Sequence, residues 1–343
     1  MNSMMTGGVF ALAGFASFLG LGLRRPASAE SLHPGEYRFS GPYTHDNLSI
    51  YLIHGPNRIS KPMLTLDEAI DQQKVIVYET RNVNELAVEN VSDEDVFIES
   101  GDIVKGGAQD RTLKDDLILQ SKSGRVNLSA FCVEHGRWSR RGNEAVATFG
   151  GAHDAIASKQ LKMAVKMKSD QGEVWARVAE AQAQLSSNLR TEVRAAASPT
   201  SYPMSMNAPA VQRSIDGYLQ ELAGIVNGKS DVIGYAFAID GKLNSADVYG
   251  SHEMFGKLWM KLLRANAVEA VSSPVAGKRG AAVSEAAVKA ALADAESGKP
   301  VVRTVNERTD VMVRETAQNI LFETRDRVRA EHAVWVHRNY LTK

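Results

Sequence analysis

The sequence of 343 residues has little of several features that would define a protein class at once. It contains one cysteine, which excludes an intramolecular disulfide framework and any zinc or iron–sulfur site built from several cysteines. It has no net charge, since 40 Lys and Arg balance 40 Asp and Glu, so we expect no nucleic-acid partner. Ten prolines and 7% aromatic residues do not indicate a disordered chain. The remaining class is a globular protein with material for roughly two domains.

The N-terminal segment has the pattern of an export signal. Residues 7–23 are uncharged and apolar, Arg24 and Arg25 follow, and Ala27-Ser28-Ala29 is a small-residue triplet. We therefore expect cleavage after Ala29 and a periplasmic or secreted protein, whose net charge is −2 because residues 1–29 carry only two arginines as charges. Two alternatives remain open, namely an uncleaved membrane anchor and a cytosolic protein with a misassigned start. A membrane partner is expected only for the anchor.

The apolar pattern predicts an α+β protein with a strand-rich, sandwich- or barrel-like domain over residues 30–150. A mixed helix–hairpin region over residues 151–343 is expected to pack on it. In the first region, short apolar runs alternate with turn residues about every ten positions, as in sandwiches and barrels. Strands are expected at 48–53, 74–78, 86–91, 96–104, 117–119 and 126–133, with a short helix at 66–70.

The second region combines helices with a hairpin and C-terminal strands. Asp170 with Glu173 forms a capping-box pattern that opens a helix, and Asp240-Gly241 is a hairpin turn signal. The absence of alternating βαβ units argues against a doubly wound nucleotide-binding fold. Helices are expected at 155–168, from 170 onward, at 210–226, after Ser251 and at 285–295, strands at 232–239, 242–249, 301–305, 311–313, 320–323 and 333–340, and a loop at 196–209.

Familiar catalytic motifs are incomplete. His252-Glu253 begins a zinc-protease pattern, but Gly256 stands where the second histidine would be. Residues 228–230 resemble the end of a phosphate-binding loop that lacks its first glycine. His332 and His337 would face opposite sides of a strand and could not chelate one ion together. We therefore predict neither a cofactor nor a metal site.

Two polar segments stand out from their strand setting. In the first, Gly106-Gly107 lets the backbone approach a ligand, Lys105 and Arg111 add positive charge, and Gln109 adds amide groups. Such a loop suits an anionic or polyhydroxylated ligand. The alternative is a glycine turn beside a solvated ion pair between Asp110 and Arg111.

The second segment is residues 131–138. Glu134 is a carboxylate in an apolar strand, so it must be paired or have a raised pKa. Glu134 is either a site carboxylate or one partner of a salt bridge at the strand end. Cys132 in the same segment is expected to be a small, buried hydrophobic residue. We expect Gln109, Arg111 and Glu134 to lie in one concave site. The full set of candidate ligand-binding residues is Glu99, Lys105, Gly106, Gly107, Gln109, Asp110, Arg111 and Glu134.

These segments carry a resemblance to a known family. The stretches at Gly101–Arg111, Cys132–Trp138 and Ile239–Leu263 resemble the bacterial and archaeal ARG-and-rhodanese-phosphatase-superfamily-associated domain, in which ARG denotes ADP-ribosylglycohydrolase. The resemblance covers residues 35–270, with an extension through Phe322–Asp326 and Trp335–His337. It implies genomic association with proteins that process ADP-ribose and with phosphatase-like proteins.

Three functions are therefore considered. The first is a small-ligand-binding module. The second is a hydrolase of glycosidic or phosphate-linked substrates that pairs two of Glu99, Asp102, Asp110 and Glu134 as acid and base. The third is an interaction protein whose apolar helix stripe from Val174 to Leu189 contacts a partner. The oligomeric state stays open.

Overall fold

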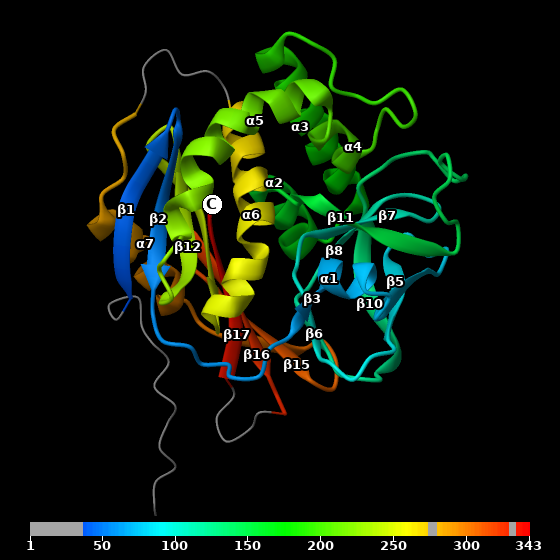
Figure 1. Cartoon of the computed structure of the whole chain (residues 1–343), viewed down its shortest axis with the longest axis horizontal. Helices are drawn as coiled ribbons and strands as arrows, with labels where there is room; N and C mark the ends of the chain where they lie inside the picture. Colours follow the sequence, from blue (N-terminus) through cyan, green and yellow to red (C-terminus); the bar gives the residue numbers. More distant parts are fainter. Residues whose placement is uncertain (1–36, 274–279, 329–333) are drawn as a thin grey trace, which may run out of the picture.

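The computed structural model describes residues 37–273, 280–328 and 334–343. An open sheet and a barrel stand on either side of a central helix (Figure 1), and the predicted α+β class is confirmed. The open sheet has eight antiparallel strands. In spatial order they are β1 (Arg38–His45), β2 (Leu48–His54), β12 (Val232–Ile239), β13 (Lys242–Tyr249), β17 (Val334–Thr342), β16 (Asn319–Asp326), β15 (Thr309–Glu315) and β14 (Val301–Thr304).

The first two strands of the chain join strands of its second half. β2 pairs antiparallel with β12, with Tyr51 opposite Ala236. All seven residues of β2 are buried, because one face of the strand meets the central helix and the other meets an outer helix. The open sheet is therefore assembled from segments that are far apart in sequence.

The barrel confirms the barrel-like sheet expected in the first half. Its strands, in closed order, are β10 (Gly124–Cys132), β5 (Glu85–Asn90), β4 (Val75–Glu79), β11 (Thr148–Ile156), β7 (Asp102–Gly106) and β8 (Arg111–Leu113). A three-stranded sheet of β3 (Leu64–Thr65), β6 (Val96–Ile98) and β9 (Leu117–Leu119) accompanies it.

The single strand predicted over 96–104 is wrong. The chain turns at Gly101, which has a φ of +92°, a conformation that glycine adopts at little cost. β6 and β7 on either side of this turn belong to different sheets. The turn brings Glu99 and Asp102 close together, with the Glu99 N–H donating to Asp102 Oδ2 at 3.0 Å.

The helix predicted over 155–168 begins later than expected. Residues 155–156 end β11, and α2 (Lys159–Met163) starts after Ser158, whose hydroxyl accepts the Leu161 N–H. A π-helical turn, Ala164–Lys168, continues α2. β1, β3, β8 and β11 were not anticipated from the apolar pattern.

Helix α3 (Gln171–Leu189) begins after Asp170, whose carboxylate accepts the Glu173 N–H as the sequence predicts. Its apolar stripe is buried within the chain, with Val178 and Leu185 part of the main core. The alternative in which this stripe contacts a partner therefore loses its support, because the chain itself covers the stripe. The other helices of this region are α1 (Leu66–Asp71), α4 (Tyr202–Met206), which lies in the segment expected to be a loop, and α5 (Pro209–Leu222), which ends in the 3-10 turn Ala223–Val226.

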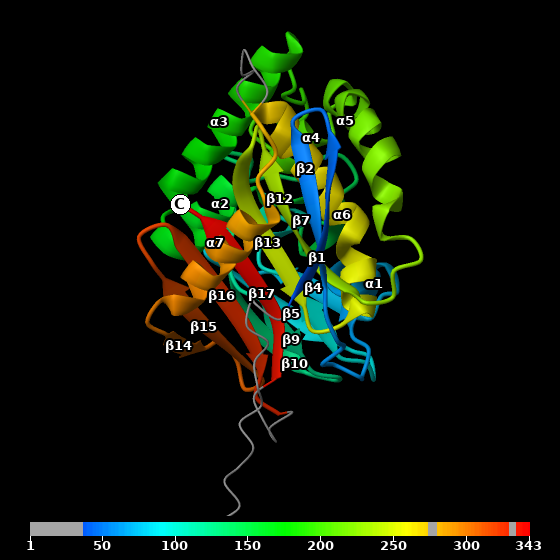
Figure 2. The same ribbon diagram turned by 90° about the vertical axis from the view of Figure 1, so that its left-hand side faces the viewer.

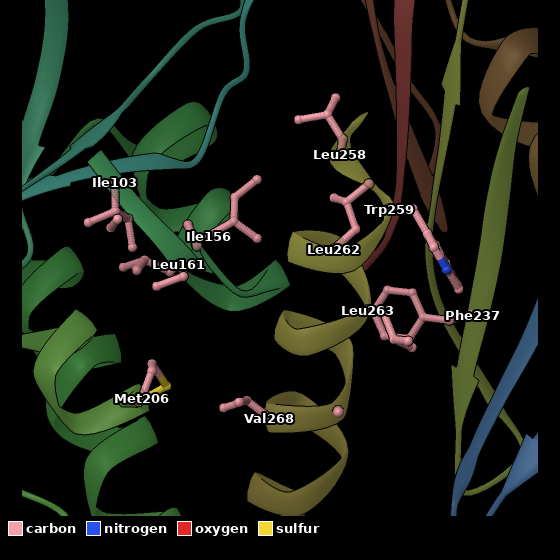
Figure 3. Packing of buried hydrophobic residues seen from close by; sticks show 14 of the residues in the cluster. Ile103, Ile156, Leu161, Met206, Phe237, Leu258, Trp259, Leu262, Leu263 and Val268 are labelled. Atoms are coloured by element: carbon pink, nitrogen blue, oxygen red, sulfur yellow. The ribbon is translucent and has the colours of Figure 1, made fainter. Parts of the chain in front are cut away.

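Helix α6 (His252–Ser272) occupies the centre of the molecule. Ser251 caps its first turn as predicted. Figure 3 shows Leu262 on the side that faces Ile156, whereas Leu263 lies beside Phe237 of the open sheet. Because both faces of α6 are apolar, the helix joins the barrel side and the sheet side in one core.

Helix α7 (Glu285–Ser297) covers the outer face of the open sheet (Figure 2), where its Val288 and Leu292 pack in a separate apolar cluster. Among the described residues, no helix has the length and apolar character needed to cross a membrane. The proposed signal at residues 1–29 and His332 lie outside the described residues.

Candidate functional site

Asp110 and Glu134 lie together beside the barrel. The Asp110 N–H donates to Glu134 Oε2 at 2.8 Å, and the Arg141 guanidinium donates to both carboxylate oxygens of Asp110 at 2.8 Å. Glu134 also accepts from Arg137 Nε at 2.6 Å and from the Ser198 hydroxyl. We call these five residues the Asp110–Glu134 cluster. Its two carboxylates are fully buried and held by donors from the protein.

The Gly106-Gly107 loop also forms hydrogen bonds with this cluster. The Gly106 N–H donates to Asp110 Oδ1 at 3.1 Å, and the Gly107 N–H donates to a backbone carbonyl at 3.0 Å. The carbonyls of both glycines accept hydrogen bonds from Arg137. Lys105 is partly buried on β7. The N–H groups that were expected to receive an anion thus have partners within the chain.

Gln109 and Arg111 are fully buried but incompletely paired. Arg111 Nη1 donates to the Gln109 carbonyl at 2.6 Å, and Arg111 Nη2 lies 3.6 Å from Glu79 Oε2. Within the described part of the chain, neither polar atom of the Gln109 side chain has a hydrogen-bond partner, and the same holds for Nε and Nη2 of Arg111. Buried polar groups are nearly always satisfied, so these atoms are the least completely paired part of the predicted site.

Glu99 belongs to a different group, which we call the junction cluster: Glu99, Asp116, Lys162, Asp247 and His337. All five are buried where the first half of the chain meets β13 and β17. His337 lies between two carboxylates, with Nδ1 2.8 Å from Asp116 Oδ2 and Nε2 3.2 Å from Asp247 Oδ1. Lys162 Nζ is 3.6 Å from Glu99 Oε1.

Burial and charge act in opposite directions on these groups. Burial raises the pKa of Glu99 to about 7. Burial alone would lower the pKa of His337, but the contacts with Asp116 and Asp247 outweigh burial and the pKa rises to about 10. Burial would likewise raise the pKa of Asp116, but the positive charge of His337 holds it well below its usual range. The cluster is therefore a set of mutually dependent charges.

Sequence reasoning missed Asp116, Lys162, Asp247 and His337. The spacing of His337 from His332, which is five residues away, gives no indication of this cluster. Asp247 and His337 could have been found by the pattern that indicated Glu134, which is an ionisable side chain within a strand. What the sequence alone does not show is that they face each other.

A cavity of about 310 Å³ opens near α2 and α6, and we call it the α2–α6 cavity. On one side Glu269 accepts the Lys159 N–H at 2.8 Å and the Asn244 amide at 3.0 Å. Burial raises the pKa of Glu269. Asn244 Oδ1 has no hydrogen-bond partner in the described residues. The lining residues are Ser158, Lys159, Gln160, Arg177, Glu180, Ala181, Gln184, Leu185, Tyr202, Met206, Asn244, Val268, Glu269, Ser272 and Ser273, none of which was a predicted site residue.

The architecture is that of an α+β protein in which one helix joins an open antiparallel sheet to a small barrel. The chain belongs to the family defined by the ARG and Rhodanese-Phosphatase-superfamily-associated Protein domain, whose family model matches residues 36–341. This match confirms the resemblance seen in the sequence and extends it through the C-terminal strands. No curated protein and no solved structure matches the chain.

Proposed function

We propose that the protein binds a small, neutral, polyhydroxylated ligand in the α2–α6 cavity. The observation that carries this proposal is the cavity of about 310 Å³, which falls at the lower end of the range of roughly 300–1,000 Å³ for small-molecule sites. The sequence allowed either an anionic or a polyhydroxylated ligand. The charges and acceptors of the lining favour the second.

The charged side chains of the lining balance. Lys159 and Arg177 are opposed by Glu180 and Glu269. Arg177 is also engaged by its own helix, since its guanidinium donates to Glu173 at 2.6 Å and to Glu180 at 2.8 Å. Because no surplus of positive charge faces the cavity, a strongly anionic ligand would be desolvated without compensation.

The lining also offers acceptors to hydroxyl groups. Glu269 presents its carboxylate to the cavity, and Asn244, whose amide donates to that carboxylate at 3.0 Å, lines the cavity beside it. Hydroxyl groups of a ligand are the natural donors to such oxygens. Tyr202 and Leu185 supply apolar surface on the same cavity, which suits the carbon-bound face of a sugar-like ring.

A thermal-shift screen followed by calorimetry tests the proposal. The probes are neutral sugars and polyols, inorganic phosphate and ADP-ribose. We expect a neutral polyhydroxylated compound to raise the melting temperature in proportion to its affinity and concentration. Asn244→Leu should abolish the shift, whereas Lys105→Ala in the glycine loop should keep it.

The opposite pattern would contradict the proposal. If phosphate or ADP-ribose stabilises the protein, and Lys105→Ala or Arg111→Ala removes the effect while Asn244→Leu does not, the ligand binds at the glycine loop. If no probe shifts the wild-type melting temperature, the cavity does not bind this class of ligand.

Hydrolysis by paired carboxylates has weaker support. Asp110 and Glu134 share the Arg141 guanidinium, so they are close together, but donors of the protein occupy both. Asp102 is held by Lys261 at 2.7 Å. The assay is release of nitrophenol from nitrophenyl glycosides or nitrophenyl phosphates. Activity in the wild type that is lost in Glu134→Gln would favour a hydrolase over a binding protein.

We also propose that the protein is exported and cleaved after Ala29, on the pattern of residues 7–29. Expression of the full chain with a C-terminal tag, followed by fractionation and N-terminal sequencing, tests this. An N-terminus at Glu30 outside the cytoplasm is expected. An intact chain in the membrane fraction would instead support the anchor, and an intact chain in the cytoplasm would contradict export.

A further inference from the structure

Three ligand-type atoms of the junction cluster converge. One atom from each of Glu99, Asp247 and His337 lies within 4.8 Å of the other two. Two donors that each bind a tetrahedral Zn²⁺ at about 2.0–2.1 Å are about 3.3 Å apart. His337 Nε2 and Asp247 Oδ1 are 3.2 Å apart, a hydrogen-bond distance that is also compatible with this spacing. We propose that these three side chains bind one divalent transition-metal ion.

The surrounding contacts orient the three ligands as in protein metal sites. His337 Nδ1 donates to Asp116, so its Nε2 points at the other two ligands, and an ion bound there takes the place of the Nε2 proton that faces Asp247, which gives the carboxylate–histidine–metal arrangement. Asn339 Nδ2 donates to Asp247 Oδ1 at 2.7 Å. The Tyr249 ring stacks on His337, with ring centroids 4.5 Å apart, and fixes the plane of the imidazole.

One oxygen of the Glu99 carboxylate has no hydrogen bond among the described residues. Tyr249 donates to Glu99 Oε2 at 3.1 Å, whereas Glu99 Oε1 accepts no hydrogen bond from any residue that the structure describes. Glu99 is fully buried, so water from the bulk does not compensate this oxygen. An ion bound by the Glu99 carboxylate together with Asp247 and His337 would place a positive charge beside this oxygen.

Lys162 is the natural competitor for such an ion. Its ammonium lies 3.6 Å from Glu99 Oε1, beyond hydrogen-bond distance but close enough to place a second positive charge beside the site. Removing this charge should tighten metal binding, while removing a ligand should weaken it. These opposite signs separate a metal site from a purely structural charge cluster.

One imidazole and two carboxylates suit a first-row divalent ion, so Zn²⁺ is the probe. The whole protein is treated with chelator, dialysed and titrated with Zn²⁺ by calorimetry, and metal content is measured after dialysis. We expect one ion per chain. Glu99→Gln and His337→Gln should each weaken binding by roughly 100-fold or more, and Asp116→Asn by about 10- to 100-fold.

Two further variants guard against misfolding as the cause of lost binding. Lys162→Met should bind Zn²⁺ about tenfold more tightly than the wild type, a gain that an unfolded variant would not show. Glu253→Gln removes an exposed carboxylate on α6 and should leave the Zn²⁺ affinity unchanged. Circular dichroism verifies the fold of each variant.

Retention of the wild-type affinity in Glu99→Gln and His337→Gln would place the ion elsewhere and overturn the proposal. Absence of saturable binding in the wild type would also overturn it, even if Lys162→Met alone bound the ion. This test is independent of the α2–α6 cavity, because its readout is metal affinity and not ligand binding.

Discussion

Replacing Glu134 by Gln tests whether the Asp110–Glu134 cluster is structural. The two side chains have nearly the same shape, so the change removes charge with little loss of volume. In the wild type the carboxylate accepts from the Asp110 N–H, from Arg137 and from Ser198. Gln keeps one acceptor oxygen but turns an NH₂ group toward groups that are themselves donors.

The contacts set the size of the effect. Arg137 Nε lies 2.6 Å from Glu134 Oε1 and loses this carboxylate partner. Arg141 Nη1 lies 3.4 Å from the same oxygen and loses the weaker of its two hydrogen bonds to carboxylates. Removing one partner of a buried ion pair costs about 3–5 kcal/mol. Because Arg141 keeps its hydrogen bonds to both oxygens of Asp110, we expect a loss at the lower end of this range, about 3 kcal/mol of unfolding free energy. Domains are stable by only about 5–15 kcal/mol, so this loss is readily measured.

Urea denaturation of the wild type and of Glu134→Gln at neutral pH measures the difference, with an unchanged dependence on urea concentration showing that the same surface unfolds. Glu253→Gln, which breaks an exposed pair with Lys257, serves as the control and should cost less than about 1 kcal/mol. A loss below 1 kcal/mol for Glu134→Gln, together with loss of ligand binding, would refute the structural role and mark Glu134 as a site carboxylate.

Three further predictions follow from buried groups. Leu262→Ala on α6 should lower the unfolding free energy by about 2–5 kcal/mol in the same urea assay, because Leu262 is only 2% exposed; a loss under 1 kcal/mol would contradict its place in the core. The Cys132 thiol should react with a thiol reagent at pH 8 only after denaturation, because it is fully buried and burial raises its pKa to about 11; fast labelling of the native protein would disprove this. Burial works to raise the pKa of Asp95, but hydrogen bonds from Arg308 and Lys61 lower this pKa below its ordinary value. The ionised Asp95 therefore stabilises the fold at pH values above its ordinary pKa. This stabilisation is lost as the pH falls through the lower pKa of the folded state. Asp95→Asn should therefore lose less stability than the wild type between pH 5 and acid, and parallel acid unfolding curves would contradict the assignment.

Local signals in the sequence predicted much of the secondary structure. Asp240 and Gly241 both have positive φ, of 49° and 72°, which is the turn that such a pair favours in a hairpin. Asp170 and Ser251 begin helices as expected because each side chain accepts a backbone N–H of the first turn. Cys132 is buried as predicted. Each of these outcomes depends on residues close together in the chain.

Pairing between distant segments could not be predicted in the same way. β11 contains Gly150-Gly151, which weakens the strand pattern, and its strand conformation is seen only in its pairing with the distant strands β4 and β7. β2 pairs with β12, which lies some 180 residues later in the chain, and in this sheet each of the two apolar faces of β2 is covered by a different helix. The apolar run at 96–104 was misinterpreted because nothing in its composition shows that the two ends enter different sheets.

The candidate sites show why a charged residue in an apolar strand is only half of a functional signal. Glu99 and Glu134 were both selected as polar groups in a strand-rich region, and both are fully buried. Nearby residues such as Arg137, three positions away, satisfy much of Glu134, so its burial is explained by structure. Glu99 depends on Tyr249, 150 residues further on, and keeps one oxygen without a hydrogen bond among the described residues. Since a folded chain rarely leaves a buried acceptor open, that oxygen is a stronger argument for a bound ion than the density of charge around it.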